Sequence, residues 1–187
     1  MFDFLSKGKG LIGITVVYLI FAAFLLPFYA QKMNKAAKQE NSAVKKADLK
    51  PLDLRFQYSK TDVDDFFKAI GPKGEEYYKF IESKIDMAYP IVYALFFMSL
   101  ITFLFRKNKW DSGLVQWLSL LPLLAAIPDY FENFNILKML EHGASDALAA
   151  KGSLFTQIKW VGVLLCLLTI LVLAFRLLII RIKPIKN

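Results

Sequence analysis

The sequence predicts an all-α membrane protein: a four-helix transmembrane bundle with a small, mostly helical extramembrane cap between the first and second spans. Two observations carry this prediction. The 187 residues are 56% hydrophobic with a mean hydropathy of +0.42, and the apolar residues fall into long runs. A hydrocarbon core about 30 Å thick requires about 20 helical residues. Soluble domains are less apolar, and their apolar residues are more dispersed along the chain.

Three apolar runs predict transmembrane helices directly. Residues 11–30 and 87–105 carry no formal charge, and the third run, 155–175, is interrupted only by Gln157 and Lys159. With their flanks, these runs predict spans at 10–30, 87–105 and 155–180. The first run follows two lysines, as a secretory signal would. Its length and the lack of a small-residue cleavage site predict an uncleaved signal anchor instead.

The remaining apolar segment has two interpretations. Residues 114–127 are too few to cross a bilayer alone. Extending the segment to 114–140 gives enough length but places Asp129 and Glu132 inside it. Two prolines in this segment remove backbone N–H groups and predict a kink. We expect a Pro-kinked third span at 114–140 with a polar outer half; a re-entrant or interfacial segment is the alternative.

Charge predicts the orientation. Lysine and arginine cluster at the N-terminus, in the 106–113 loop and at the C-terminus, so the positive-inside rule places both termini in the cytoplasm, in a bacterial inner membrane. The long loop at 31–86 carries twelve Lys and Arg, which argues for the opposite orientation, although ten acidic residues accompany them. The net charge of +8 is typical of attraction to anionic lipid, so the expected partner is the bilayer and not nucleic acid.

The cap prediction covers residues 31–86 and begins with 31–50, which lack apolar periodicity. This stretch either extends the first helix as a lysine-rich stalk or is partly disordered. The following "LDLRFQYS" alternates apolar and polar residues, which predicts an extended segment with one apolar face. That face would hold Leu52, Leu54, Phe56 and Tyr58.

A helix is expected next, with Thr61 as its cap and an acidic first turn. Its apolar face is Val63, Phe66, Phe67 and Ile70, and Gly71-Pro72 ends it. A second helix from near Glu75 runs into the second span. A module of this size has too few residues for a robust independent core. We therefore expect it to fold back onto the outer membrane face, or onto a membrane-protein partner.

Polar residues interrupt the third span in an ordered way. Asp129, Glu132 and Asn133 are spaced i, i+3 and i+4 and so share one helix face. Ala125 and Ala126, one turn earlier, leave room for close approach of another helix. The second and fourth spans carry polar residues at the same depth, namely Asp86, Tyr89, Tyr93, Thr156, Gln157 and Lys159. Three helices are thus expected to meet in one polar layer beneath the cap. Lys159 is the nearest candidate for a cationic partner of the carboxylates, and Lys151 or a loop lysine is the next.

This layer supports more than one interpretation. Its candidate ligand-binding residues are Asp129, Glu132, Asn133, Tyr89, Lys159, Asp86 and Gln157. An ionisable group inside a span is a functional-site hypothesis, here for a small amphipathic or cationic ligand, or an ion. The alternatives are a buried network that only fixes helix register, a catalytic acid/base pair, or a cluster in interfacial water. No residue is assigned a catalytic role.

The rest of the sequence limits the chemistry. One cysteine, Cys166, lies in an apolar run, and one histidine, His142, follows the third span. Neither a disulfide framework nor a usual zinc site is expected, and no cofactor motif occurs. The preferred function is a non-catalytic pocket. The two alternatives are a subunit or assembly factor docking through the cap at 51–86, and a membrane-embedded acid/base enzyme acting on a lipid.

Several stretches of the sequence resemble a pattern found in other proteins. The stretches "DLRFQYSKTDV", "FFKAIGPKGEEYY" and "DMAYPIVYALFF", followed by "PLLAAIPDYFENFNIL", resemble a recurrent pattern in small bacterial membrane proteins. Those proteins have four predicted spans, an exported first loop and a D-Y-x-E-N motif in the third span. The resemblance covers most of residues 52–137. It implies a class of protein without a chemistry, because no activity is established for the group.

Overall fold

The computed structural model describes residues 6–45, 49–110 and 117–182. Within these residues the protein is all-helical and contains no strand, which confirms the all-α prediction. Three helical segments are long and apolar enough to cross a membrane: Gly8–Glu40, Lys60–Lys107 and Asp146–Ile180. Their outward side chains are apolar and exposed, as at Phe24 and Leu171, which are 68% and 65% exposed. Such faces suit contact with lipid.

The first segment is one continuous helix with a wide turn in its middle. It comprises α1 (Gly8–Leu19), a π-helical turn at Ile20–Leu25 and α2 (Leu26–Glu40). Pro27 follows the π turn after one intervening residue, Leu26. Because proline has no N–H and its ring collides with the carbonyl four residues earlier, a locally widened helix accommodates it. The helix continues to Glu40, so the predicted lysine-rich stalk is helical up to that residue.

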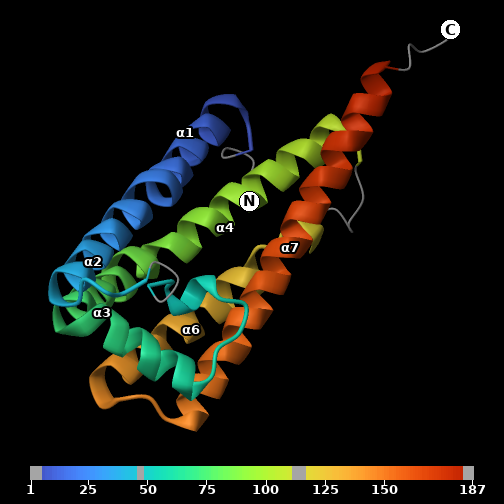
Figure 1. The fold of residues 1–187 in the computed structure, drawn as a ribbon. Helices are drawn as coiled ribbons and strands as arrows, with labels where there is room; N and C mark the ends of the chain where they lie inside the picture. The colour runs from blue at the N-terminus through green and yellow to red at the C-terminus, as the bar shows by residue number, and fades with distance from the viewer. Residues whose placement is uncertain (1–5, 46–48, 111–116, 183–187) are drawn as a thin grey trace, which may run out of the picture.

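The central helix of the molecule is α4 (Asp86–Lys107). It continues from α3 (Lys60–Phe80) through a second π-helical turn, Ile81–Ile85. Figure 1 shows α4 lying between the first helix and α7 (Asp146–Ile182). α1 packs on α4, and α7 packs on both α4 and α6.

α6 (Leu123–His142) and α7 form an antiparallel pair joined by a short loop. Gly143 ends α6 with a φ of 82°, a backbone conformation that favours glycine. A Cβ placed on Gly162 of α7 would lie 2.8 Å from the Ala125 backbone nitrogen, so the expected close helix approach at Ala125 is present. The 20 residues of α6 extend about 30 Å. α6 is too polar to be among the three membrane-compatible segments, so the fourth span at 114–140 stays a prediction; residues 111–116 lie outside the described residues.

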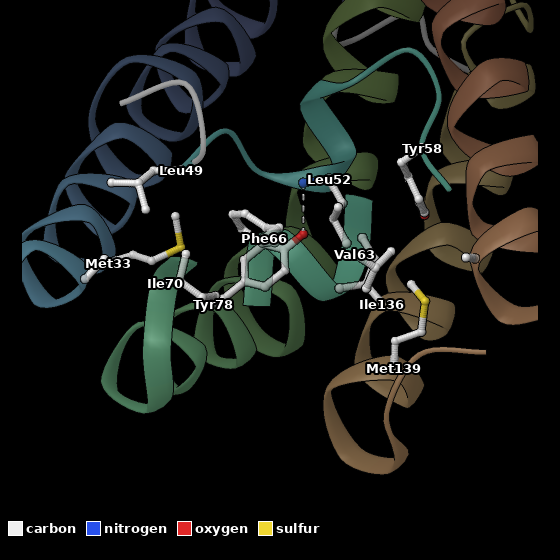
Figure 2. Packing of buried hydrophobic residues seen from close by; sticks show 12 residues of the cluster. Met33, Leu49, Leu52, Tyr58, Val63, Phe66, Ile70, Tyr78, Ile136 and Met139 are labelled. Carbon is white, nitrogen blue, oxygen red and sulfur yellow. Dashed lines mark hydrogen bonds between the residues drawn. The ribbon is translucent and has the colours of Figure 1, made fainter. Parts of the chain in front are cut away.

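The predicted cap segment packs back onto the helix ends. Figure 2 shows its core, in which side chains from α3 and the preceding loop meet the ends of α2 and α6. Fully buried members include Met33, Leu52, Phe66, Tyr78 and Ile136. The Leu52 backbone N–H donates to the Tyr78 hydroxyl over 3.3 Å, which fixes the loop on the helix.

The extended segment predicted for residues 52–59 is wrong. Leu52–Leu54 form a 3₁₀ turn, and the chain is irregular afterwards. Three residues per turn cannot keep a two-residue alternation on one face. Leu52 and Tyr58 are accordingly buried, whereas Leu54 and Phe56 are 50% and 58% exposed.

The predicted helix cap at Thr61 is also wrong by two residues. Ser59 caps α3 in a capping box: its hydroxyl accepts from the Asp62 N–H over 3.2 Å, and the Asp62 carboxylate accepts from the Ser59 N–H over 2.7 Å. The predicted break at Gly71-Pro72 is confirmed as a kink, with Gly71 at φ 64°. The helix resumes there and runs into α4.

The exposure of Phe66 is relevant to the alternative in which the chain docks onto a membrane complex through residues 51–86. That hypothesis expected Phe66, Phe67 or Tyr77 to be exposed in the isolated chain. Phe66 is 1% exposed, and its ring meets the Tyr78 ring edge-on with 5.1 Å between centroids. Phe67 and Tyr77 are half-buried. The aromatic stripe of α3 therefore supplies the core of the cap.

Candidate functional site

An ion-pair centre joins α6 to α7. Lys159 Nζ lies 2.6 Å from Glu132 Oε2 and 3.3 Å from Asp129 Oδ1. All three side chains are buried. The expected pairing of Lys159 with the two carboxylates is thus confirmed. Attraction between opposite charges is strong in such a poorly solvated place, and it offsets the loss of hydration.

Two hydroxyl groups complete the hydrogen bonding of the carboxylates. Tyr93 of α4 donates to Asp129 Oδ2 over 2.9 Å, and Thr156 of α7 donates to Glu132 Oε1. Glu132 and Thr156 are both fully buried. Three helices therefore contribute to one polar layer, which is the arrangement that the sequence predicts.

Asn133 has a structural partner. Its Nδ2 donates to the Asp86 backbone carbonyl over 2.9 Å. That carbonyl would normally accept from the N–H four residues later, but residue 90 is proline and has none. Tyr130 makes a similar contact, its hydroxyl donating to the Met87 carbonyl over 2.8 Å. α6 thus supplies a donor to the Asp86 carbonyl, which Pro90 leaves without its helical N–H.

A cavity of about 410 Å³ reaches this layer from the side. It lies on the face of α4 between the first helix and α7. Its volume falls within the range typical of ligand pockets, about 300–1,000 Å³. Most of its wall is apolar or aromatic. Its charged wall residues are Asp53, Asp86, Asp129 and Lys159.

The side chain of Asp86, one of these wall residues, has no polar partner among the described residues. It is 5% exposed, and its carboxylate makes no hydrogen bond or ion pair with the residues that the structure describes. Asp129 and Lys159, by contrast, engage one another. A buried carboxylate without a partner either holds its proton or attracts a cation. Asp86 is therefore the side chain best placed to meet a ligand.

The loop before α3 closes the polar end of the cavity. The Asp53 carbonyl accepts from Lys159 Nζ and from Trp160 Nε1, each over 3.2 Å. Burial raises the pKa of the Asp53 carboxyl above its ordinary value, and the nearby Lys159 ammonium opposes that shift. The irregular conformation of residues 52–54, which the sequence did not predict, brings Asp53 to this place.

Glu82 is a second buried carboxyl group. It is fully buried, and neither of its oxygens has a hydrogen-bond partner among the described residues. It precedes Asp86 by four residues, on the π-helical turn. The wall of the cavity does not include it.

The predicted site residues therefore divide into two groups. Asp86, Tyr89, Asp129 and Lys159 line the cavity. Glu132 and Asn133 lie behind the wall in contacts between helices. Gln157 is half-buried and does not line the cavity.

Sequence reasoning missed Asp53 and Glu82 as members of this region, because both fall in the segment assigned to the cap. The isoleucines that flank Glu82, at positions 81 and 85, were a usable signal that this turn is buried. Asp53 gave no such signal, since its place depends on loop packing. Within the described residues, no group of three or more His, Cys, Asp or Glu side chains is arranged to hold a metal.

Comparison with protein-family models, curated proteins and solved structures gives no match for this chain.

Proposed function

We propose that this chain is a bacterial inner-membrane protein whose side cavity binds a small amphipathic cation. In this proposal α6 provides the fourth span beside the three membrane-compatible helices, and both termini are cytoplasmic. The cavity then lies in the outer half of the bundle, under the cap. The chain is a binding protein and not an enzyme.

The cavity wall at Asp86 carries the proposal. An apolar cavity of about 410 Å³ ends at a carboxylate that is 5% exposed and has no partner among the described residues. The apolar wall suits a hydrocarbon chain, each buried CH₂ contributing about 0.8 kcal/mol. The carboxylate suits a positive head group, because a charge-assisted contact in a poorly solvated site is stronger than one in water.

Charge balance favours a cation over an anion. Among the described residues, Lys159 is the one positive side chain on the cavity wall, and it is engaged by Asp129 and Glu132. An anionic head group would have to compete with those two carboxylates for Lys159. A cationic head group meets Asp86 without breaking an existing pair.

The geometry gives less support to the lipid-enzyme alternative. Asp129 and Glu132 were its acid/base candidates. Both are held by Lys159, and Glu132 is fully buried behind the cavity wall. An acid/base pair has to reach the proton that it moves.

Titration with decylammonium tests the proposal. The purified full chain in a maltoside detergent is expected to bind decylammonium saturably and to show no saturable binding of decyl sulfate. Asp86→Asn should weaken the binding at least about tenfold, since one charge-assisted contact is removed. Glu141→Gln is the matched control. It also removes one carboxylate, but this carboxylate pairs with Lys79 on the surface, 2.7 Å away. Equal binding by Asp86→Asn and wild type would refute the proposal.

A further inference from the structure

We infer that the cation is a long-chain quaternary ammonium, recognised by tyrosine rings around Asp86. This inference rests on the proposed function and names the ligand class for the same cavity. It concerns the aromatic side chains of the cavity wall, two of which, Tyr93 and Trp160, also adjoin the ion-pair centre.

Five aromatic side chains with electron-rich rings line the cavity, from four different helices: Tyr18, Tyr78, Tyr89, Tyr93 and Trp160. The Tyr18 and Tyr89 rings lie parallel with 6.3 Å between centroids, and the Tyr89 and Tyr93 rings meet at 71° with 5.2 Å between centroids. Rings set at different angles around one space are the arrangement that binds alkylated ammonium groups through cation–π attraction.

The carboxylate and the rings share one stripe of α4. Asp86, Tyr89, Tyr93 and Phe97 follow one another at i, i+3, i+7 and i+11, so they face the same way. All four line the cavity. Tyr89 lies about 4.5 Å along the helix axis from Asp86. A cation at Asp86 is therefore beside the Tyr89 ring.

Asp129 and the Asp53 carbonyl are already engaged, whereas the Asp86 and Asp53 carboxylates make no hydrogen bond to another described residue. Asp129 accepts from Tyr93 and pairs with Lys159, and the Asp53 carbonyl accepts from Lys159 and Trp160. A primary ammonium brings three N–H donors, and each unsatisfied donor in a buried site is unfavourable. A trimethylammonium group has no N–H and needs only negative charge and ring faces.

The remaining wall fits a single hydrocarbon chain. Ala22, Leu26, Pro27 and Ala30 of the first helix form one side, and Val163 of α7 and Phe97 of α4 form the other. α1 and α7 both pack on α4, so this part of the cavity lies between two membrane-compatible helices. A chain bound there continues the hydrocarbon phase of the bilayer.

Tryptophan fluorescence of Trp160 provides the test. Of the three tryptophans in the chain, only Trp160 lines the cavity, and the Trp110→Phe, Trp117→Phe variant leaves it as the sole reporter. This variant, in maltoside micelles, is titrated with decyltrimethylammonium and with decylammonium. Empty micelles and Asp86→Asn define non-specific partition. The quaternary probe is expected to bind about tenfold more tightly than the primary probe, as one desolvated cation–π contact implies.

Tyr89→Leu should abolish that preference, because removal of the ring weakens binding of the quaternary probe more than binding of the primary probe, and an unchanged unfolding transition shows that the variant is folded. Tyr77→Leu, in the cap and away from the cavity, should keep the preference. Equal or tighter binding of decylammonium by the parent variant would overturn this inference and leave the proposed function standing. If neither probe binds above the level of Asp86→Asn, both are overturned.

Discussion

The Asn133 side-chain amide donates a hydrogen bond to the backbone carbonyl of Asp86, with 2.9 Å between Nδ2 and the oxygen. The same residue, Asp86, lines the cavity, and its carboxylate makes no hydrogen bond with the described residues. Pro90 leaves that carbonyl without a helical N–H. Asp86 is therefore fixed by a hydrogen bond to its backbone carbonyl, while its carboxylate has no hydrogen-bond partner among the described residues. The polar layer is a structural network on one side and a candidate binding surface on the other.

A double-mutant cycle can measure the coupling between Asn133 and Pro90, which both determine the donor available to the Asp86 carbonyl. Asn133→Ala leaves the Asp86 carbonyl buried without a partner and should lower the free energy of unfolding by about 1–3 kcal/mol. In a Pro90→Ala background, the alanine brings a backbone N–H that can donate to that carbonyl. The loss should then be smaller by about 1 kcal/mol. Asn135→Ala, which removes a bond to the Phe131 carbonyl, should lose the same amount in both backgrounds. Strict additivity for Asn133 and Pro90 would contradict the account.

Removing the buried ammonium group of Lys159 should destabilise the protein strongly. Lys159→Met leaves Asp129 and Glu132 buried side by side, and we expect a loss of about 3–5 kcal/mol in unfolding free energy. Adding Asp129→Asn and Glu132→Gln should recover most of it, because no uncompensated charge remains. Lys151→Met, at an exposed position of the same helix, should change stability by less than about 0.5 kcal/mol. Chemical denaturation in micelles measures all three. If Lys159→Met were as stable as Lys151→Met, the ion-pair centre would make no measurable contribution to the free energy of unfolding.

Two glycines test the packing of α6 on α7. A Cβ on Gly162 would lie 2.8 Å from the Ala125 nitrogen, whereas a Cβ on Gly13 would meet nothing within 4 Å. Gly162→Ala should therefore destabilise the protein by about 1–3 kcal/mol, since two backbones must separate. Gly13→Ala should leave stability unchanged or slightly higher, because alanine favours the helix. Thermal unfolding of the two variants compares them, and the reverse order would show that the helices are not in close contact at Gly162.

The capping box of α3 predicts a difference between neighbouring hydroxyl residues. Ser59→Ala removes the acceptor for the Asp62 N–H and should lower stability by about 1 kcal/mol. Thr61→Ala, two residues on, removes no cap and should have an effect within about 0.5 kcal/mol. The unfolding transition of the cap distinguishes them. A larger effect at Thr61 would support the position expected from sequence over the one in the structure.

Orientation is tested by labelling in intact cells. A cysteine introduced at Lys45, an exposed position after α2, should react with a membrane-impermeant thiol reagent. A cysteine at Lys107, at the other end of α4, should react only after the membrane is permeabilised. Cys166 is buried and is replaced by serine in both variants. Labelling at Lys107 and not at Lys45 would reverse the proposed topology.

The long apolar helices were predictable because each depends on a run of residues and on little else. The meeting of Asp129, Glu132 and Lys159 was predictable too, because helical spacing and bilayer depth together limit where each side chain can lie. The close approach at Ala125 followed from side-chain size.

The loop before α3 was not predictable in the same way. Alternation in residues 52–59 is compatible with a strand, but tertiary contacts with Tyr78 and Ser153 decide the conformation. The role of Asn133 also depended on a partner 47 residues away, so no local pattern could separate a binding residue from a structural one. The cavity itself is a product of how three helices pack, and a sequence records it only indirectly.

The central claim is that Asp86 receives a cation at the end of the apolar cavity. An experimental structure with decylammonium carrying a terminal bromine tests it most directly, since anomalous scattering locates the bromine. We expect the ammonium nitrogen at about 2.8 Å from the Asp86 carboxylate and the bromine between Leu26 and Val163. A nitrogen bound elsewhere, or a cavity without ligand at saturating concentration, would contradict the account.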